Sequence, residues 1–280
     1  MQNVLYDQKV KTPFRYPGGK FYAIRHLLPY INNIAHDEYR EPFVGGGSVF
    51  FAKNKVSLNW INDIDSELIN TYEIIRDDPH SIIDGLDSEI ASKQRHAEIR
   101  NQIVDSKLRR ACKYYYLNRT SYSGKMISPS WGYRDKRSIP PHRWHEVIIP
   151  ASQKLQNTKI TNLDFIDVIE AESSVKNVLL YLDPPYFKPS KTKHYVNGFN
   201  MKDHKRLRDS LKNTRYTFLL SYEDCDEIRD MYSWAHIYQL AWTYRVGDSN
   251  FSDSVRKTGN EIVVTNADFR DSTFKQLKIF

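Results

Sequence analysis

Apolar runs that end in loop residues recur along the chain, with polar helical sequence between several of them. The run Val178–Leu182 is uniformly apolar, as expected of a parallel strand that is buried on both faces. Further strands are predicted at Val56–Ile61, Thr217–Ser221, His236–Ala241 and Glu261–Thr265. This alternation of strands and helices predicts an α/β fold with a mixed, mostly parallel sheet.

Residues 66–157 have a different character. They contain polar helical sequence followed by a segment rich in Pro, Ser and Gly, without a clear strand signal. We therefore predict one α/β domain, formed by residues 1–65 and 158–280, that is interrupted by a helical insert at 66–157. A length of 280 residues is sufficient for a domain of this kind.

The chain is basic, with 41 Lys and Arg against 34 Asp and Glu. Its formal charge of +7 is compatible with a polyanionic partner but does not require one. No apolar stretch approaches the roughly 20 residues that a membrane span needs, and Met1–Leu5 lack the apolar core of a signal peptide. We therefore expect a cytoplasmic protein without a membrane partner.

Cysteine and histidine give no sign of a metal. Cys112 and Cys225 are far apart in sequence, which argues against a disulfide scaffold and against a cysteine-rich zinc site. His142 and His145 are near neighbours, but two histidines alone do not make a metal site. No metal is expected.

The run Val178–Leu182 ends at Asp183-Pro184-Pro185-Tyr186. Two consecutive prolines donate no backbone hydrogen bonds and hold φ at roughly −65°, so the chain leaves the sheet in a stiff turn. Ligands of open α/β sheets bind beyond the carboxyl ends of the strands. The turn therefore offers a carboxylate, the carbonyl of Pro184 and the aromatic face of Tyr186, which together suit a planar base that carries an amino group.

Two glycine-rich segments lie near the N-terminus. Gly18-Gly19-Lys20 lacks the flanking residues of a P-loop, and Gly45–Ser48 lacks the third glycine of a dinucleotide fingerprint. A cofactor with a ribose but no phosphate fits better, and S-adenosylmethionine is such a cofactor. Asp63 is placed like an acid that hydrogen-bonds ribose hydroxyls. One of Asp63 and Asp65 is expected to be the N-cap of a helix that begins at Ser66.

Basic residues are dense at positions 107–145, where Asp135 is the sole acid. Such density with interleaved aromatic residues is typical of a surface that contacts nucleic acid. Tyr122–Lys125 is predicted to form a hairpin-like loop that reaches bases, and Arg119 and Lys125 are candidates for phosphate or guanine contacts. Tyr114–Tyr116 are expected instead to lie on a helix and to pack in the hydrophobic core.

The order of these motifs resembles that of the Dam-type (D12 class) adenine-N6 DNA methyltransferases. The matching segments are Arg15–Lys20, Glu41–Phe50, Asn62–Asp65, Tyr114–Asn118, Tyr122–Gly124 and Asp183–Tyr186. Together they span nearly the whole chain. The resemblance implies a Rossmann-like, S-adenosylmethionine-dependent methyltransferase fold, in which 66–157 is the target-recognition insert and the rest is the catalytic domain.

The motifs and the resemblance together give three groups of candidate site residues. The catalytic group is Asp183, Pro184 and Tyr186. The group that binds the methyl donor is Tyr16, Lys20, Phe43, Gly45, Gly47, Asp63 and Asp183. The group that binds DNA is Arg119, Tyr122, Ser123, Lys125, Arg134 and Arg137.

The implied reaction transfers a methyl group from S-adenosylmethionine to N6 of an adenine that is flipped out of double-stranded DNA, and S-adenosylhomocysteine is the product. The enzyme is expected to act alone or beside a cognate restriction endonuclease. The open alternatives are cytosine N4, RNA or another planar amide as acceptor, and a DNA-binding relative without catalysis. Intact Asp183, Tyr186 and Lys20 argue against the last.

The loop after Tyr122 departs from the family pattern. Relatives that methylate GATC are expected to carry an arginine shortly after the Tyr-x-Gly segment, where it reads guanine. Here Met126 and Ile127 follow Lys125. We therefore hypothesise a target other than GATC, or a relaxed target.

Overall fold

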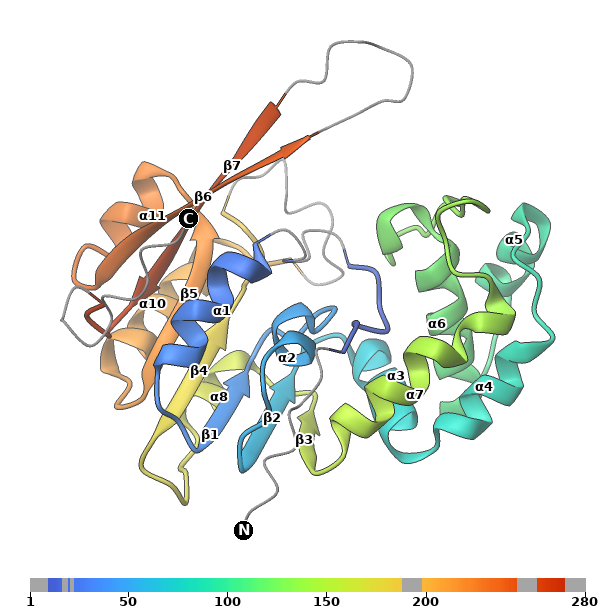
Figure 1. Ribbon diagram of the computed structural model, residues 1–280, viewed down its shortest axis with the longest axis horizontal. Helices are drawn as coiled ribbons and strands as arrows, with labels where there is room; N and C mark the ends of the chain where they lie inside the picture. Colours follow the sequence, from blue (N-terminus) through green and yellow to red (C-terminus); the bar gives the residue numbers. More distant parts are fainter. Residues whose placement is uncertain (1–9, 17–19, 21–22, 188–197, 246–255, 270–280) are drawn as a thin grey trace.

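A computed structural model describes residues 10–16, 20, 23–187, 198–245 and 256–269 (Figure 1). Within these residues, seven strands form one sheet with the order β3-β2-β1-β4-β5-β7-β6. The strands are β1 (Glu38–Glu41), β2 (Leu58–Asn62), β3 (Thr158–Thr161), β4 (Val178–Leu182), β5 (Thr217–Glu223), β6 (His236–Arg245) and β7 (Arg256–Thr265). β1 to β5 pair in parallel, and β7 pairs antiparallel with both β5 and β6. The predicted mixed, mostly parallel sheet is confirmed.

Helices cover both faces of the sheet (Figure 1). α1 (Ile24–Asn33) and α2 (Ser48–Ala52) contribute to the core on one face, and α8 (Phe165–Glu170), α10 (Met201–Asn213) and α11 (Asp226–Met231) contribute to the core on the other. This double cover explains why β4 is apolar along its whole length.

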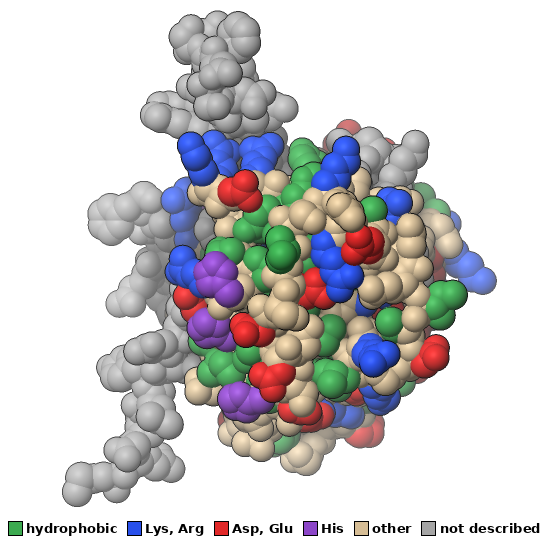
Figure 2. Space-filling view, turned by 90° about the vertical axis from the view of Figure 1, so that its right-hand side faces the viewer, with side chains coloured by type: hydrophobic (Ala, Val, Ile, Leu, Met, Phe, Trp, Pro, Cys, Tyr) green, Lys and Arg blue, Asp and Glu red, His purple; other side chains and the backbone are tan. Residues whose placement is uncertain are grey.

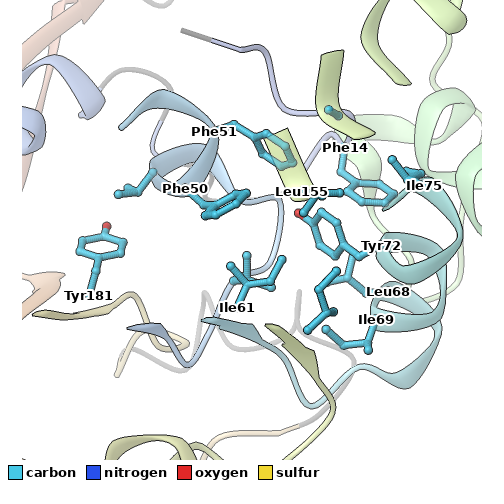
Figure 3. Packing of buried hydrophobic residues seen from close by; sticks show 14 of the residues in the cluster. Phe14, Phe50, Phe51, Ile61, Leu68, Ile69, Tyr72, Ile75, Leu155 and Tyr181 are labelled. Carbon is cyan, nitrogen blue, oxygen red and sulfur yellow. The ribbon is translucent and has the colours of Figure 1, made fainter. Parts of the chain in front are cut away.

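β4 is buried on both faces, as its uniformly apolar sequence predicts. Leu179 and Tyr181 belong to the core under α1 and α2, whereas Val178, Leu180 and Leu182 belong to the core under α8, α10 and α11. In Figure 3, Phe50 and Phe51 of α2 lie between Tyr181 and the side chain of Tyr72. β4 is thus held firmly just before the chain reaches Asp183.

The helices between β2 and β3 lie to one side of the sheet (Figure 1). They are α3 (Ser66–Asp77), α4 (Pro79–Asp87), α5 (Lys93–Asn101), α6 (Lys107–Thr120) and α7 (His145–Leu155). Tyr114–Tyr116 of α6 are buried, as predicted, and Tyr115 packs edge-to-face against Trp144 at a ring distance of 5.4 Å. The segment predicted as an insert is therefore helical, and its role in target recognition stays a prediction.

Strand boundaries differ from the predicted ones. β2 is shifted to Leu58–Asn62, β5 reaches Glu223, β6 reaches Arg245 and β7 begins at Arg256. β3 is missing from the predicted strands because Ile160 is its one large apolar side chain. Such a short, polar strand has no recognisable periodicity.

Some features are absent from the part of the chain that the structure describes. No described helix has both the length and the apolar composition required to span a bilayer. In the same residues, no group of three or more His, Cys, Asp and Glu side chains is arranged to hold a metal ion. Cys112 and Cys225 are free thiols.

Candidate functional site

The strand order reverses between β1 and β4, which pair in parallel at the centre of the sheet. In an open α/β sheet, this reversal opens a crevice at the carboxyl ends of the strands. A cavity of about 800 Å³, including the part open to solvent, lies at this crevice. Its lining residues are Tyr16, Pro42, Phe43, Gly45, Asp63, Ile64, Asp65, Leu163, Asp164, Phe165, Asp183, Pro185, Gly198, Phe199, Asp203 and Arg206. Five residues predicted to bind the methyl donor are therefore brought together here.

The glycine-rich loop between β1 and α2 owes two of its glycines to packing within the protein. Gly45 and Gly47 have φ of +47° and +68°, in the left-handed region that other residues rarely adopt. A Cβ on Gly45 would lie 3.0 Å from the ring of Tyr16, and one on Gly47 would lie 2.8 Å from the hydroxyl of Tyr72. Gly45 lines the cavity, whereas Gly47 is the N-cap of α2 and is not among the lining residues.

Asp63 and Asp65 follow β2 and have different tasks. Asp65 is the N-cap of α3: its Oδ1 accepts hydrogen bonds from two backbone N–H groups of the first turn, at 3.0 and 3.2 Å. Its Oδ2 accepts from the Tyr114 hydroxyl at 3.1 Å. Asp63 accepts from the Gly45 N–H at 2.8 Å and faces the cavity. The prediction that one of the two aspartates caps the helix is confirmed: Asp65 is the N-cap, and both aspartates line the cavity.

The buried position of Asp63 makes its carboxyl group a weaker acid than an ordinary aspartate. Burial raises the pKa of Asp63 to about 6, although backbone N–H groups of Asp65 and Gly45 act to lower it. The side chain is therefore charged at pH 7 and above, and it becomes protonated as the pH falls below 6.

Three phenylalanines form an aromatic wall of the cavity. The rings of Phe43 and Phe165 stack at 5.2 Å with an interplanar angle of 29°, and Phe199 meets Phe43 edge-on at 5.7 Å. Only Phe43 is among the predicted site residues. Phe165 comes shortly after β3, so recognising that strand would have pointed to it. Next to it, Asp164 is the N-cap of α8 and pairs with Arg206 at 3.0 Å.

A buried cluster of charges lies beside the cavity, at the end of β4. The Lys20 Nζ is 2.8 Å from Oδ1 of Asp183 and 3.1 Å from Oε2 of Glu261. It also contacts the Tyr186 hydroxyl, which donates to Oε1 of Glu261 at 2.5 Å. Lys20 is 3% exposed and does not line the cavity. Glu261 is absent from the predicted site.

The charges of this cluster depend on one another. Burial acts to lower the pKa of Lys20, but Asp183 and Glu261 outweigh it, so the pKa is raised and Lys20 stays protonated. Burial raises the pKa of Asp183; Lys20 opposes this and Glu261 adds to it. Below them, burial raises the pKa of Glu41 to about 8. Asp183 therefore depends on Lys20 to remain ionised in this setting.

The two oxygens of Asp183 are used differently. Oδ1 takes the Lys20 ammonium and accepts a hydrogen bond from the Ser221 hydroxyl at 3.1 Å. Among the residues with a described position, none donates to Oδ2. Pro185 lines the cavity whereas Pro184 is buried, and Tyr186 is only 7% exposed. The predicted roles of the Pro184 carbonyl and of the Tyr186 ring as a stacking plate stay predictions.

Five of the six predicted DNA-binding residues line a second hollow of about 980 Å³, including its open mouth, and Lys125 is not among the lining residues. Its lining residues are Arg15, Arg119, Tyr122, Ser123, Gly132, Arg134, Arg137, Ser138 and Ile139. The hairpin-like loop is confirmed, because the Tyr122 N–H donates to the Ser130 carbonyl at 2.8 Å and Ser121 forms an antiparallel bridge with Trp131. Figure 2 looks onto the helical side, where Lys and Arg side chains gather along the upper edge.

The residues of this hollow differ in their accessibility. Tyr122 is 54% exposed, and the Lys125 ammonium lies 5.9 Å from the centre of its ring. Arg119 is 8% exposed and donates to the Pro13 carbonyl at 3.2 Å. Arg15, which is not among the predicted residues, donates to the Arg119 carbonyl at 3.3 Å. The hollow is thus strongly cationic.

Comparison with known proteins gives one consistent family. Residues 16–246 match the D12 class N6 adenine-specific DNA methyltransferase family. The Type II methyltransferase M1.LlaDCHI of Lactococcus lactis subsp. cremoris is 30% identical, over 94% of this chain and 99% of its own length. The DNA adenine methylase of Serratia marcescens is 25% identical, over 82% and 90%. The Type II methyltransferase M.CviBI of Paramecium bursaria Chlorella virus NC1A is 25% identical, over 92% and 100%. The chain therefore belongs to the D12 class N6 adenine-specific DNA methyltransferase family.

Proposed function

We propose that the protein methylates N6 of a flipped adenine in double-stranded DNA, with S-adenosylmethionine as the donor. The main observation behind this proposal is the position of Asp183. It lies at the end of β4, forms an ion pair with Lys20, and lines the same cavity as Asp63. Family membership and relatives named DNA adenine methylase or Type II methyltransferase support adenine in DNA, and the latter name also fits a cognate restriction endonuclease as a partner.

The chemistry of the cavity fits this donor. Its lining offers the carboxylates of Asp63 and Asp183 and an aromatic wall. Its arginine, Arg206, is already paired with Asp164 and Asp203. A phosphate-bearing cofactor would meet negative charge in this lining, whereas a cationic nucleoside without phosphate would be stabilised. We assign Asp63 to the ribose hydroxyls and the aromatic wall to the adenine ring of the donor.

The reaction needs little more than alignment and charge. When bound, S-adenosylmethionine supplies an electrophilic sulfonium methyl group. Asp183 and the Pro184 carbonyl accept hydrogen bonds from the two N–H groups of the acceptor amine, which favours a pyramidal nitrogen and stabilises the positive charge that develops there. That charge is lost when the methylated nitrogen releases one of its protons, which passes to solvent. Lys20 and Ser221 hold Oδ1 of Asp183, so that Oδ2 is left for the amine. Tyr186 would stack the flipped base.

The direct test is single-molecule sequencing of genomic DNA from a methylation-deficient host that expresses the protein. N6-methyladenine at one motif, absent from a host that carries Asp183→Ala, is the expected result. Methylation at cytosine N4 would show that cytosine, not adenine, is the acceptor. The absence of any methylated base in the DNA would refute the proposal. A methylome confined to GATC would contradict the specificity inferred from Met126 and Ile127.

Donor binding should depend on Asp63 and on pH. Asp63→Asn is expected to weaken donor binding about tenfold at pH 7.5, because a carboxylate accepts hydrogen bonds from hydroxyls more strongly than an amide does. Since burial raises the pKa of Asp63 to about 6, affinity of the unchanged protein should fall as the pH drops below 6. Titration calorimetry with S-adenosylmethionine between pH 5 and 8 measures both effects.

Asp65→Ala is the matched control for this prediction. It removes the N-cap of α3 and the acceptor of the buried Tyr114 hydroxyl, and should cost about 2 kcal/mol of folding free energy. Because both oxygens of Asp65 are already bonded within the protein, donor affinity should change little. Two results would show that Asp63 does not bind the donor. One is an equal loss of affinity in the two variants, and the other is an Asp63→Asn variant whose affinity keeps the pH dependence of the unchanged protein.

DNA affinity should depend on the exposed arginines of the second hollow. Arg134→Gln and Arg137→Gln are each expected to weaken binding to all sequences alike and to reduce the slope of log affinity against log salt by about 0.9, as for one lost phosphate contact. Fluorescence anisotropy at several salt concentrations measures this. Arg215→Gln removes an exposed arginine that pairs with Glu172 and should leave the slope unchanged. An unchanged slope in the first two variants would place the DNA elsewhere.

A further inference from the structure

We propose that Glu261 is a positioning residue for the reaction: it shares Lys20 with Asp183 and anchors Tyr186, so that the cluster keeps a net negative charge beside the acceptor amine. This inference rests on the proposed function. Glu261 comes from β7, the antiparallel strand that lies between β5 and β6, far along the chain from the other members of the cluster.

Each carboxylate oxygen of Glu261 has its own partner. Oε1 accepts from the Tyr186 hydroxyl at 2.5 Å, and Oε2 lies 3.1 Å from the Lys20 Nζ. The Glu261 side chain is 14% exposed, so these contacts are little screened by solvent. Glu261 thereby fixes both the cation that supports Asp183 and the aromatic side chain of the Asp-Pro-Pro-Tyr turn.

The charge balance gives this arrangement a function. Lys20 alone would neutralise Asp183, because an isolated pair of one cation and one carboxylate has no net charge. With Glu261 present, one cation serves two carboxylates, and a single net negative charge remains. Positive charge develops on the acceptor nitrogen as the methyl group is transferred, and a fixed negative charge nearby stabilises it.

Several other groups face this cluster. The buried side chains of Tyr181 and Glu41 interact electrostatically with Asp183. Glu223 of β5 stands opposite Glu261 in the sheet register, and the Ser221 hydroxyl donates to Asp183. Among these side chains, Glu261 is the carboxylate that contacts both Lys20 and Tyr186.

The test is Glu261→Gln, which keeps the shape of the side chain and removes its charge. We expect kcat for DNA methylation to fall about 30-fold, while KM for the donor changes less than about threefold, because an interaction specific to the transition state is lost. Glu261 raises the pKa of Asp183, so the acid limb of the pH–rate profile should move to lower pH in the variant. A role limited to structure would not move that limb in this direction.

Glu172→Gln is the charge-matched control. Glu172 is 84% exposed and pairs with Arg215 on the surface, so kcat and the pH profile should be unchanged. An unchanged pH profile in Glu261→Gln, or a loss that appears in KM alone, would overturn the inference. If the unaltered protein leaves DNA unmethylated, the proposed function fails instead.

A second measurement tests the shared contact without any activity. The melting temperatures of Glu261→Gln, Lys20→Met and the double variant form a cycle, in which the combined loss should be clearly smaller than the sum of the single losses, because both changes remove the same contact. Additive losses would show that Glu261 and Lys20 are not coupled and would overturn the inference, whether or not the protein methylates DNA.

Discussion

Asp183→Ala is expected to lower kcat for DNA methylation by about a thousandfold, the upper range for removing one group that stabilises charge in a transition state. The variant removes the carboxylate that, in the proposed reaction, accepts a hydrogen bond from the acceptor amine. Lys20 keeps Glu261 as a partner, so the fold should survive the change. Transfer of radiolabelled methyl groups to duplex DNA, measured in single turnovers, gives the chemical step directly.

Two further variants separate charge from shape at this position. Asp183→Asn keeps the outline and one acceptor oxygen but loses the charge, and its kcat should fall less than that of the alanine variant. Ser221→Ala removes only a hydroxyl that donates to Oδ1 at 3.1 Å, and it should cost less than about tenfold. If Asp183→Ala retained a tenth or more of the activity, another group would have to stabilise the amine.

The predicted part of the site follows from local sequence. Asp183 was predictable because a uniformly apolar strand and two prolines fix where the chain leaves the sheet. Asp63 follows a strand in the same way and was predicted to meet the ribose, although sequence alone did not show which of Asp63 and Asp65 caps the next helix. Hydrogen bonds to the first turn of α3 decide between them. The predicted methyltransferase fold is supported by the sheet order and by the family.

The unpredicted part depends on contacts between distant segments. Glu261 reads as one polar position in a β-strand, and only the insertion of β7 beside β5 brings it to Lys20. β1 likewise carries charged residues, yet Arg40 is fully buried because it pairs with Glu38 at 2.6 Å and donates to the Val168 carbonyl at 2.9 Å. Hydrophobic patterns cannot predict such burial, since the compensating partners lie elsewhere in the sequence.

Lys20→Met is expected to destabilise the protein by about 3 kcal/mol at pH 8, because removing one partner of a buried ion pair leaves uncompensated charge. Asp183 and Glu261 would then repel each other, and the pKa of Asp183 would rise further. A carboxylate with a raised pKa in the folded state binds protons more tightly there than when unfolded, so stability should recover as the pH falls toward 5. Chemical denaturation at pH 5 and pH 8 measures this recovery.

The acid limb of the activity profile should shift to higher pH in Lys20→Met, opposite to the shift expected for Glu261→Gln, because one change removes a cation and the other an anion from beside Asp183. Shifts in the same direction for Lys20→Met and Glu261→Gln would show that the ionisation of Asp183 does not set the acid limb.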